Sequence, residues 1–234
     1  MNNAGRYVFF IRQGVHTPPF KAGRALVLLL VMGILGSCLG ISSEIAIGRD
    51  GSGTITLEYR ISRMVESLGK LDGNERWLPV PVGQADFERT IARIEGLTMD
   101  SFSSKSTDED IINTVKLAFA NREALVRFLD ATGQRASWEA GPGGNRLTLS
   151  LGGGAGVQNQ ELLRLAAALT EGYSLRFSLS LPGSAALSLR DSQGRVLENP
   201  PAGTIESRGG RVVFSSPMAD MLSLTGAVVM EIGW

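Results

Sequence analysis

The stretch Tyr173-Ser-Leu-Arg-Phe-Ser-Leu-Ser-Leu181 alternates apolar and polar residues more regularly than any other part of the chain. Because successive side chains of a β-strand point to opposite faces, this alternation predicts a strand with one buried and one solvated face. The stretch Thr54-Ile-Thr-Leu-Glu-Tyr-Arg-Ile61 has the same pattern, and Asp50-Gly51 before it is typical of a hairpin turn. Half-buried strands are therefore the basis of the predicted fold.

Shorter alternating runs between turn residues predict further strands. These runs are residues 97–105, 111–119, 134–139, 147–151, 187–190, 203–206, 211–214 and 227–232, with Ile45 and Ile47 before the first hairpin. The run 111–119 also fits one face of a helix. We interpret it as a strand because Asn121, directly after it, is a favourable N-cap for a new helix.

Three longer segments have the apolar spacing of amphipathic helices, and each ends at a glycine. They are the segment of Phe87, Ile91 and Ile94 before Gly96, the segment from Arg122 to Gly133, and residues 160–171 before Gly172. Pro217 opens a short fourth helix. One-faced strands with a few such helices predict an α+β fold, a mostly antiparallel β-sheet with about three to four amphipathic helices packed on one face.

The beginning of the chain has the organisation of a secretion signal. Lys21 and Arg24 precede an uncharged apolar run at 25–35, whose 11 residues are fewer than the roughly 20 of a membrane-spanning helix. Leu35, Gly36, Ser37 and Cys38 then resemble a bacterial lipobox, in which small residues admit the peptidase and the thiol accepts diacylglycerol. The alternatives are an ordinary signal peptide with an incidental Cys38, or an N-terminal anchor helix.

These features predict three regions along the chain. Residues 1–37 are a lipoprotein signal peptide, residues 38–43 a short lipid-anchored tether, and residues 44–234 a single α+β domain. A tether of this length holds the domain within about 20 Å of the bilayer, at about 3.3–3.6 Å per residue. We therefore expect the membrane to be a partner through the lipid anchor.

The composition from Cys38 onward excludes several kinds of function. Four cations and no acids precede Cys38, so 19 Lys and Arg remain against 23 Asp and Glu, a net charge of −4. Such a surface has no electrostatic attraction to nucleic acid. The only histidine is His16, and Cys38 is the only cysteine. Ser-His and Cys-His catalytic pairs, zinc sites of His or Cys, and haem held by His are thereby excluded, and we expect no metal and no cofactor.

An enzyme with carboxylate or Ser-Lys chemistry is the competing alternative. Ser103 and Lys105 lie on the same face of a predicted strand, and Asp108 and Asp110 are close in sequence. A general base also requires a shifted pKa, which a sequence does not reveal. We therefore predict a non-enzymatic protein without catalytic residues.

A curved sheet with helices beside it can leave an apolar groove for a ligand. The residues that we expect to face such a groove are Trp77, Leu78, Val80, Met218, Met221 and Leu222. The alternative is that these side chains belong to the ordinary core, or to a loop tucked onto it. The sequence leaves both interpretations open.

Three short motifs together resemble the LppM-like lipoprotein domain family of bacteria. They are Asp50-Gly-Ser-Gly-Thr-Ile-Thr-Leu-Glu-Tyr59, Phe119-Ala-Asn-Arg-Glu-Ala-Leu125 and Ser178-Leu-Ser-Leu-Pro-Gly183, within a match of about residues 43–232. The resemblance implies a protein anchored to the cell envelope that handles lipids or glycolipids. It carries no catalytic residues.

The sequence as a whole predicts a lipid-anchored, non-enzymatic protein of the bacterial cell envelope. Its domain would bind a lipid-like ligand or an envelope protein. The alternative is a structural subunit of an envelope assembly.

Overall fold

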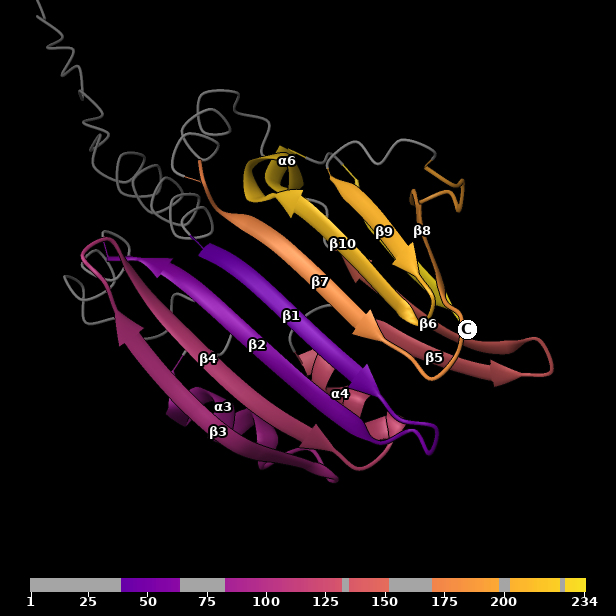
Figure 1. Ribbon diagram of the computed structural model, residues 1–234, viewed down its shortest axis with the longest axis horizontal. Coiled ribbons are helices and arrows are strands. Elements are labelled where there is room, and N and C mark those ends of the chain that lie inside the picture. The colour runs from indigo at the N-terminus through magenta and orange to yellow at the C-terminus, as the bar shows by residue number, and fades with distance from the viewer. Residues whose placement is uncertain (1–38, 64–82, 132–134, 152–169, 198–202, 224–225) are drawn as a thin grey trace, which may run out of the picture.

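A computed structural model describes residues 39–63, 83–131, 135–151, 170–197, 203–223 and 226–234. The described chain forms two β-sheets, one of seven strands and one of four (Figure 1). The larger sheet has the strand order β3-β4-β2-β1-β7-β10-β9, and the smaller one has the order β5-β6-β11-β8.

The larger sheet is antiparallel except at its centre, where β1 and β7 run parallel. Its strands are β1 (Leu39–Ile47), β2 (Gly53–Ser62), β3 (Leu97–Ser106), β4 (Asp110–Phe119), β7 (Ser174–Ser180), β9 (Thr204–Arg208) and β10 (Arg211–Pro217). Strand β1 begins at Leu39 and pairs with β2 from its first residue. The predicted tether 38–43 is therefore part of a strand from residue 39 onward.

The smaller sheet is antiparallel throughout. Its strands are β5 (Ala136–Gly141), β6 (Gly144–Leu151), β8 (Ala186–Arg190) and β11 (Val228–Gly233). In Figure 1 it lies behind the half of the larger sheet that holds β7, β10 and β9.

Helices cover part of the inner face of the larger sheet. They are α3 (Gln84–Ile91), α4 (Arg122–Ala131) and α6 (Met218–Ser223). Helices α3 and α4 lie behind β2, β3 and β4 in Figure 1. The side chain of Asn121 accepts a hydrogen bond from the backbone N–H of Ala124 (2.9 Å), as expected for the N-cap of α4.

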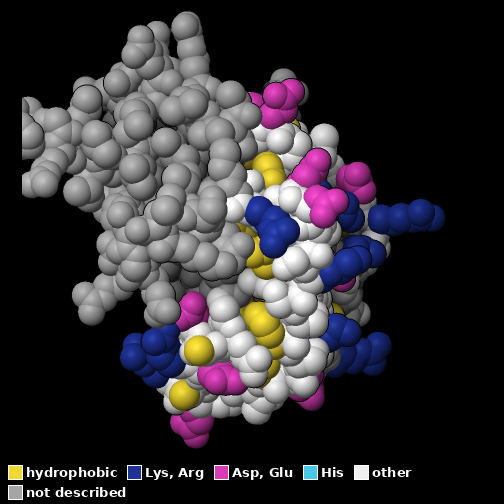
Figure 2. Space-filling model, turned by 90° about the vertical axis from the view of Figure 1, so that its left-hand side faces the viewer, with side chains coloured by type: hydrophobic (Ala, Val, Ile, Leu, Met, Phe, Trp, Pro, Cys, Tyr) yellow, Lys and Arg dark blue, Asp and Glu magenta, His cyan; other side chains and the backbone are white. Residues whose placement is uncertain are grey.

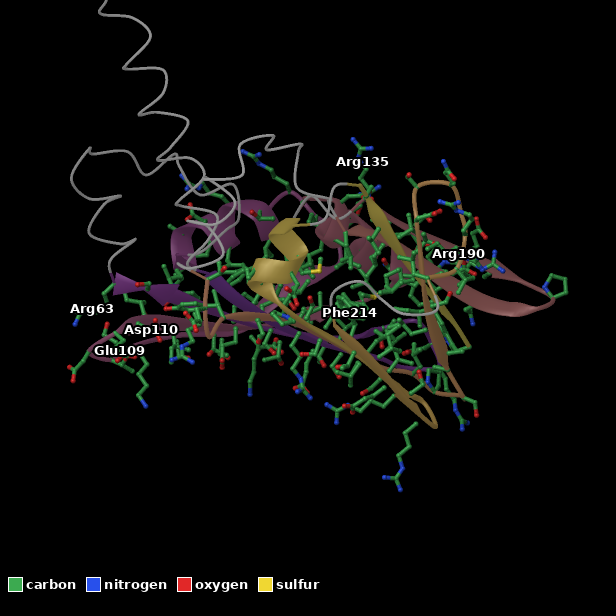
Figure 3. The ribbon with its side chains drawn as sticks, turned by 90° about the horizontal axis from the view of Figure 1, so that it is seen from above. Arg63, Glu109, Asp110, Arg135, Arg190 and Phe214 are labelled. Carbon is green, nitrogen blue, oxygen red and sulfur yellow. The ribbon has the colours of Figure 1, made fainter. Side chains whose placement is uncertain are left out.

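Both sheets and the helices contribute to one hydrophobic core. Strand β2 directs Ile55, Leu57, Tyr59 and Ile61 inward, and each is at most 6% exposed. The facing strands β6 and β11 bury Leu147, Leu149, Met230 and Ile232 completely. Figure 3 shows Phe214 of β10 near the middle of the molecule, and this side chain is 1% exposed. The apolar faces of these inner strands are thus buried by another layer.

The predicted fold class is wrong. Strands make up 57% of the described residues and helices 16%, with three helices there and two sheets. The prediction was a single sheet with three to four helices on one face. The structure instead has a larger sheet, one face of which is covered by a smaller sheet and by the helices. Residues 160–169 of the predicted helix 160–171 lie outside the described residues, and Thr170 and Glu171 are part of a turn. The predicted loop that contains Trp77, Leu78 and Val80 also lies outside the described residues.

The physical reason for this error lies in strand pairing. An alternating run has the same pattern whichever partner it pairs with, so the runs in β6 and β11 did not reveal a sheet of their own. The location of most elements is confirmed, including the ambiguous run 111–119, which forms β4. The predicted end of the first helix at Gly96 is wrong, because α3 ends at Ile91 with Ala92 as its C-cap. Gly96, with a positive φ (81°), lies in the turn that leads into β3.

Candidate functional site

The end of the larger sheet where β1 begins is next to Cys38 in the sequence. At this end Leu39 pairs with Ile61 of β2, and Ile61 pairs with Ile111 of β4. We call this end, with the β3–β4 turn at 107–109 and the start of β7, the anchor pole. Figure 2 faces it, and on its described surface basic, acidic and apolar side chains are interspersed.

Three side chains at the anchor pole form a partly buried polar cluster. Asp110 of β4 accepts a hydrogen bond from Arg60 Nε (2.5 Å) and another from the Tyr173 hydroxyl (2.6 Å). The Asp110 side chain is 2% exposed and that of Arg60 is 51% exposed. The hydrogen bond from Arg60 to Asp110 raises the pKa of Arg60 above its ordinary value. The cluster joins β2, β4 and the start of β7 with a fixed, paired charge.

Gly40 lies beside this cluster. Gly40 of β1 lies opposite Arg60 in the sheet, and a Cβ at Gly40 would lie 3.4 Å from both Arg60 Cβ and Tyr173 Cδ1. The guanidinium carbon of Arg60 lies 5.8 Å from the centre of the Tyr173 ring. Such packing of a cation over an aromatic ring is favourable.

The backbone of the β3–β4 turn is joined to the end of β2. Figure 3 shows Arg63, Glu109 and Asp110 together at this end of the sheet. The Arg63 N–H donates to Glu109 O (2.8 Å), and its guanidinium donates to Thr107 O (3.2 Å). The anchor pole is therefore a network of structural contacts.

The structure describes only part of the groove predicted from the sequence. Trp77, Leu78 and Val80 lie outside the described residues, as do Leu35, Gly36, Ser37 and Cys38 of the lipobox. Met218 and Met221 of α6 are each 8% exposed and belong to the hydrophobic core. Leu222 is in the same helix, and the description does not extend to its side chain.

The residues of the enzymatic alternative do not form a cluster. Ser103 and Lys105 are both exposed on β3, which is an edge strand. Asp108 is exposed in the β3–β4 turn, whereas Asp110 is buried against Arg60. No group of three or more potential metal ligands occurs in the described part of the chain.

A cavity of about 350 Å³ opens at the opposite end of the molecule. We call it the distal cleft. The polar and aromatic residues of its wall include Arg49, Asp50, Asn121, Glu123, Trp138 and Trp234. They come from the β1–β2 turn, the start of α4, strand β5 and the residue after β11. The cleft thus lies where the ends of the two sheets meet the start of a helix.

Two tryptophans hold the wall of the distal cleft in place. The rings of Trp138 and Trp234 pack edge to face, with centroids 4.9 Å apart and planes at 77°. Asn145 of β6 fixes both residues. Its side-chain oxygen accepts a hydrogen bond from Trp138 Nε1 (3.3 Å), and its backbone exchanges two hydrogen bonds with that of Trp234 (2.9 and 3.1 Å).

The charged groups of the distal cleft balance one another. Hydrogen bonds from the Ser52 hydroxyl and backbone N–H lower the pKa of Asp50. A hydrogen bond from Arg122 (2.8 Å) lowers the pKa of Glu123. Both carboxylates are therefore ionised at neutral pH and offset the charges of Arg49 and Arg122. The wall of the cleft carries no net charge.

Sequence reasoning missed the distal cleft. Trp138 was placed on a strand, Asp50 in a turn and Asn121 at a helix cap, each for a local reason. Trp138 and Trp234 are far apart in the sequence, so no local pattern indicates that their rings meet.

Comparison with solved structures shows a weak similarity of fold. No family model matches the sequence, and no curated protein matches it. Among solved structures, the chain is similar to the folded domain of the Mycobacterium tuberculosis protein LppM, with 11% identity and a TM-score of 0.44. The match covers 85% of this chain and 91% of that one.

No described helix is both long enough and apolar enough to cross a bilayer.

Proposed function

We propose that the chain is a non-enzymatic lipoprotein of the bacterial cell envelope, attached to its membrane through acylated Cys38. The lipobox at 35–38 supports this proposal from the sequence. The observation that carries it from the structure is that β1 begins at Leu39, directly after the proposed lipid-bearing residue.

The position of β1 in the sheet determines what such an anchor would do. Strand β1 pairs with β2 over its whole length and with β7 from Ile41 to Ala46. A lipid on the preceding residue would therefore be joined to the centre of a seven-stranded sheet without a flexible linker. The anchor pole would lie against the headgroups, and the distal cleft would face away from them.

The domain is proposed to bind an envelope component rather than to transform one. Ser103 and Lys105 are both exposed to solvent on β3, an edge strand of the larger sheet. A lipid-like ligand at an apolar groove and an envelope protein partner both remain part of this proposal. Met218 and Met221 lie in the core. The proposed groove is therefore supported by the sequence pattern of Trp77, Leu78 and Val80, which lie outside the described residues.

Metabolic labelling with a clickable fatty-acid analogue tests the anchor. We expect the wild-type protein to be labelled and to partition with membranes. Cys38→Ser should abolish the label and leave a larger, unprocessed precursor, because serine has no thiol to accept diacylglycerol. The matched control is Ser37→Ala, which keeps a small residue in the lipobox and should be labelled normally.

The proposal is rejected if the wild-type protein takes up no label, or if Cys38→Ser is processed and labelled like the wild type. Cross-linking in intact cells then distinguishes a lipid-like ligand from an envelope protein partner. One stoichiometric protein partner would favour a structural subunit over a lipid-binding protein.

A further inference from the structure

We propose that the distal cleft binds an uncharged saccharide. The inference starts from the cavity of about 350 Å³ and the side chains in its wall. Its volume lies in the range of about 300–1,000 Å³ that is typical of small-molecule sites. The cavity is lined by aromatic and hydrogen-bonding groups together, and this combination decides the ligand class.

The tryptophans supply the apolar part of the site. Trp138 and Trp234 are both partly exposed, and both line the cavity. The edge-to-face contact and the hydrogen bond from Trp138 to Asn145 fix the orientation of the rings before any ligand arrives. A pyranose ring has a face of C–H groups that packs on such an indole, and rigid aromatic groups lose little entropy on binding.

The polar groups supply the hydrogen bonds. Carboxylates at Asp50 and Glu123 accept hydrogen bonds, and the Arg49 guanidinium donates them. Arg49 forms no ion pair with any residue that the structure describes, so its donors are available. Hydroxyl groups donate and accept at once, and a sugar ring carries them around its rim.

The charge balance excludes other ligand classes. Two arginines and two ionised acids in the wall leave no excess of either sign to attract an anion or a cation. The apolar lining is confined to the two indoles, Pro182 and the largely buried Ile47. An acyl chain would therefore face charged groups along most of the wall.

The source of the saccharide follows from the length of β1, and this step alone rests on the proposed anchor. Strand β1 runs from Leu39, next to the lipid, to Ile47 in the cleft wall. Nine residues at about 3.3 Å each place the cleft roughly 30 Å from the anchored end. A glycolipid headgroup in the same leaflet is out of reach, so the ligand is a free saccharide or part of a polymer.

Tryptophan fluorescence tests the inference on the full-length protein in a zwitterionic detergent that has no sugar headgroup. The chain has three tryptophans, and Trp77→Phe leaves the two of the cleft as the only indole signal. The probes are maltotriose, N,N′,N″-triacetylchitotriose and inorganic phosphate. We expect a saturable change with at least one trisaccharide, with a Kd on the order of 0.1–10 mM, and none with phosphate.

Two variants locate the response in the cleft. Arg49→Ala should weaken trisaccharide binding at least about fivefold, because it removes a guanidinium donor from the exposed turn in the cleft wall. Arg208→Ala, an exposed arginine on β9, is the matched control and should bind as the wild type does. Trp138→Phe should also weaken binding, and its thermal unfolding midpoint shows whether the domain remains folded.

Three results would overturn the inference: no saturable response to either trisaccharide, a response to phosphate alone, or trisaccharide binding that Arg49→Ala and Trp138→Phe leave intact. In vesicles that contain digalactosyldiacylglycerol, a response before free sugar is added would overturn the assignment to a free or polymeric ligand. The full chain with Cys38→Ser should still bind the trisaccharide. Failure of sugar binding and failure of lipidation are therefore separate outcomes.

Discussion

Tyr59 places a titratable hydroxyl group inside the core of the larger sheet. Its side chain points to the same face of β2 as Ile55, Leu57 and Ile61, and only 3% of the residue is exposed. Its ring packs at 6.0 Å from that of Phe87 in α3. Burial disfavours the charged phenolate and raises the pKa of Tyr59 to about 12 from 10.0.

This raised pKa predicts a loss of stability in alkaline solution. Between pH 10 and pH 12 the folded protein keeps the Tyr59 proton while the unfolded chain releases it, so the unfolded state gains stability as pH rises. The stabilisation that comes from the protonated Tyr59 is fully present below pH 10. A tenfold change in proton affinity corresponds to about 1.4 kcal/mol, so the free energy of unfolding should fall by up to about 3 kcal/mol between pH 10 and pH 12. Urea denaturation at pH 9, 10.5 and 11.5 measures it.

Tyr59→Phe is the control for this prediction. Phenylalanine keeps the ring and removes the ionisable group, so the variant should lose less stability than the wild type between pH 10 and pH 12. Equal losses in both proteins would show that other groups cause the alkaline sensitivity.

At the scale of the secondary-structure elements, the Arg60–Asp110–Tyr173 cluster ties separate strands together. Its members come from β2, β4 and the residue before β7, and β1 lies between β2 and β7 in the sheet. Asp110 is the shared acceptor, and its carboxylate is almost completely buried. Removing that charge leaves two donors without their acceptor.

Asp110→Asn should therefore destabilise the domain by about 2 kcal/mol, because an amide cannot accept hydrogen bonds from both Arg60 and Tyr173 in the same geometry. Because Arg60 is half exposed, the loss in the free energy of unfolding should be smaller than for a fully buried ion pair. Urea denaturation at pH 7 gives the free energy of unfolding. Asp108→Asn, at an exposed acid in the adjacent turn, is the matched control and should change it by at most about 0.5 kcal/mol. Equal effects of the two substitutions would contradict the assigned role of the cluster.

The elements themselves could be predicted from the sequence to a large extent. Alternation in Thr54–Ile61 and Tyr173–Leu181 is a local property, because it reports which side of a strand is buried. Pairing partners are not local. The parallel contact of β1 with β7 and the separate sheet of β6 and β11 join segments that are far apart in the chain. The two-sheet architecture was missed for this reason.

The same distinction applies to the candidate sites. Cys38 and its lipobox are contiguous in sequence, so their interpretation needs no fold. The distal cleft depends on the contact between Trp138 and Trp234, which forms only because β5 and β11 pair with opposite edges of β6. The sequence shows Asp110 only as an acid close to Asp108, whereas in the fold its carboxylate accepts a hydrogen bond from a tyrosine that is 63 residues away.

At the scale of the whole molecule, the larger sheet acts as a rigid spacer between its two poles. The β3–β4 turn with Asp108 lies at the anchor pole, and the β1–β2 turn with Arg49 lies at the other end. If Cys38 carries the lipid, the first turn is close to the bilayer and the second is roughly 30 Å farther away, since strands rise by about 3.3 Å per residue. The anchored domain therefore has a predicted orientation.

Fluorophore labelling measures this orientation in vesicles. If acylation occupies Cys38, the only native cysteine, Asp108→Cys and Arg49→Cys each provide a single thiol for a dye. Nitroxide groups on the lipid acyl chains quench over short distances only. We expect strong quenching of the dye at position 108 and weak quenching at position 49, because the sheet holds these exposed turns at opposite ends. Equal quenching, or the reverse order, would mean that the domain does not stand on the pole where β1 begins.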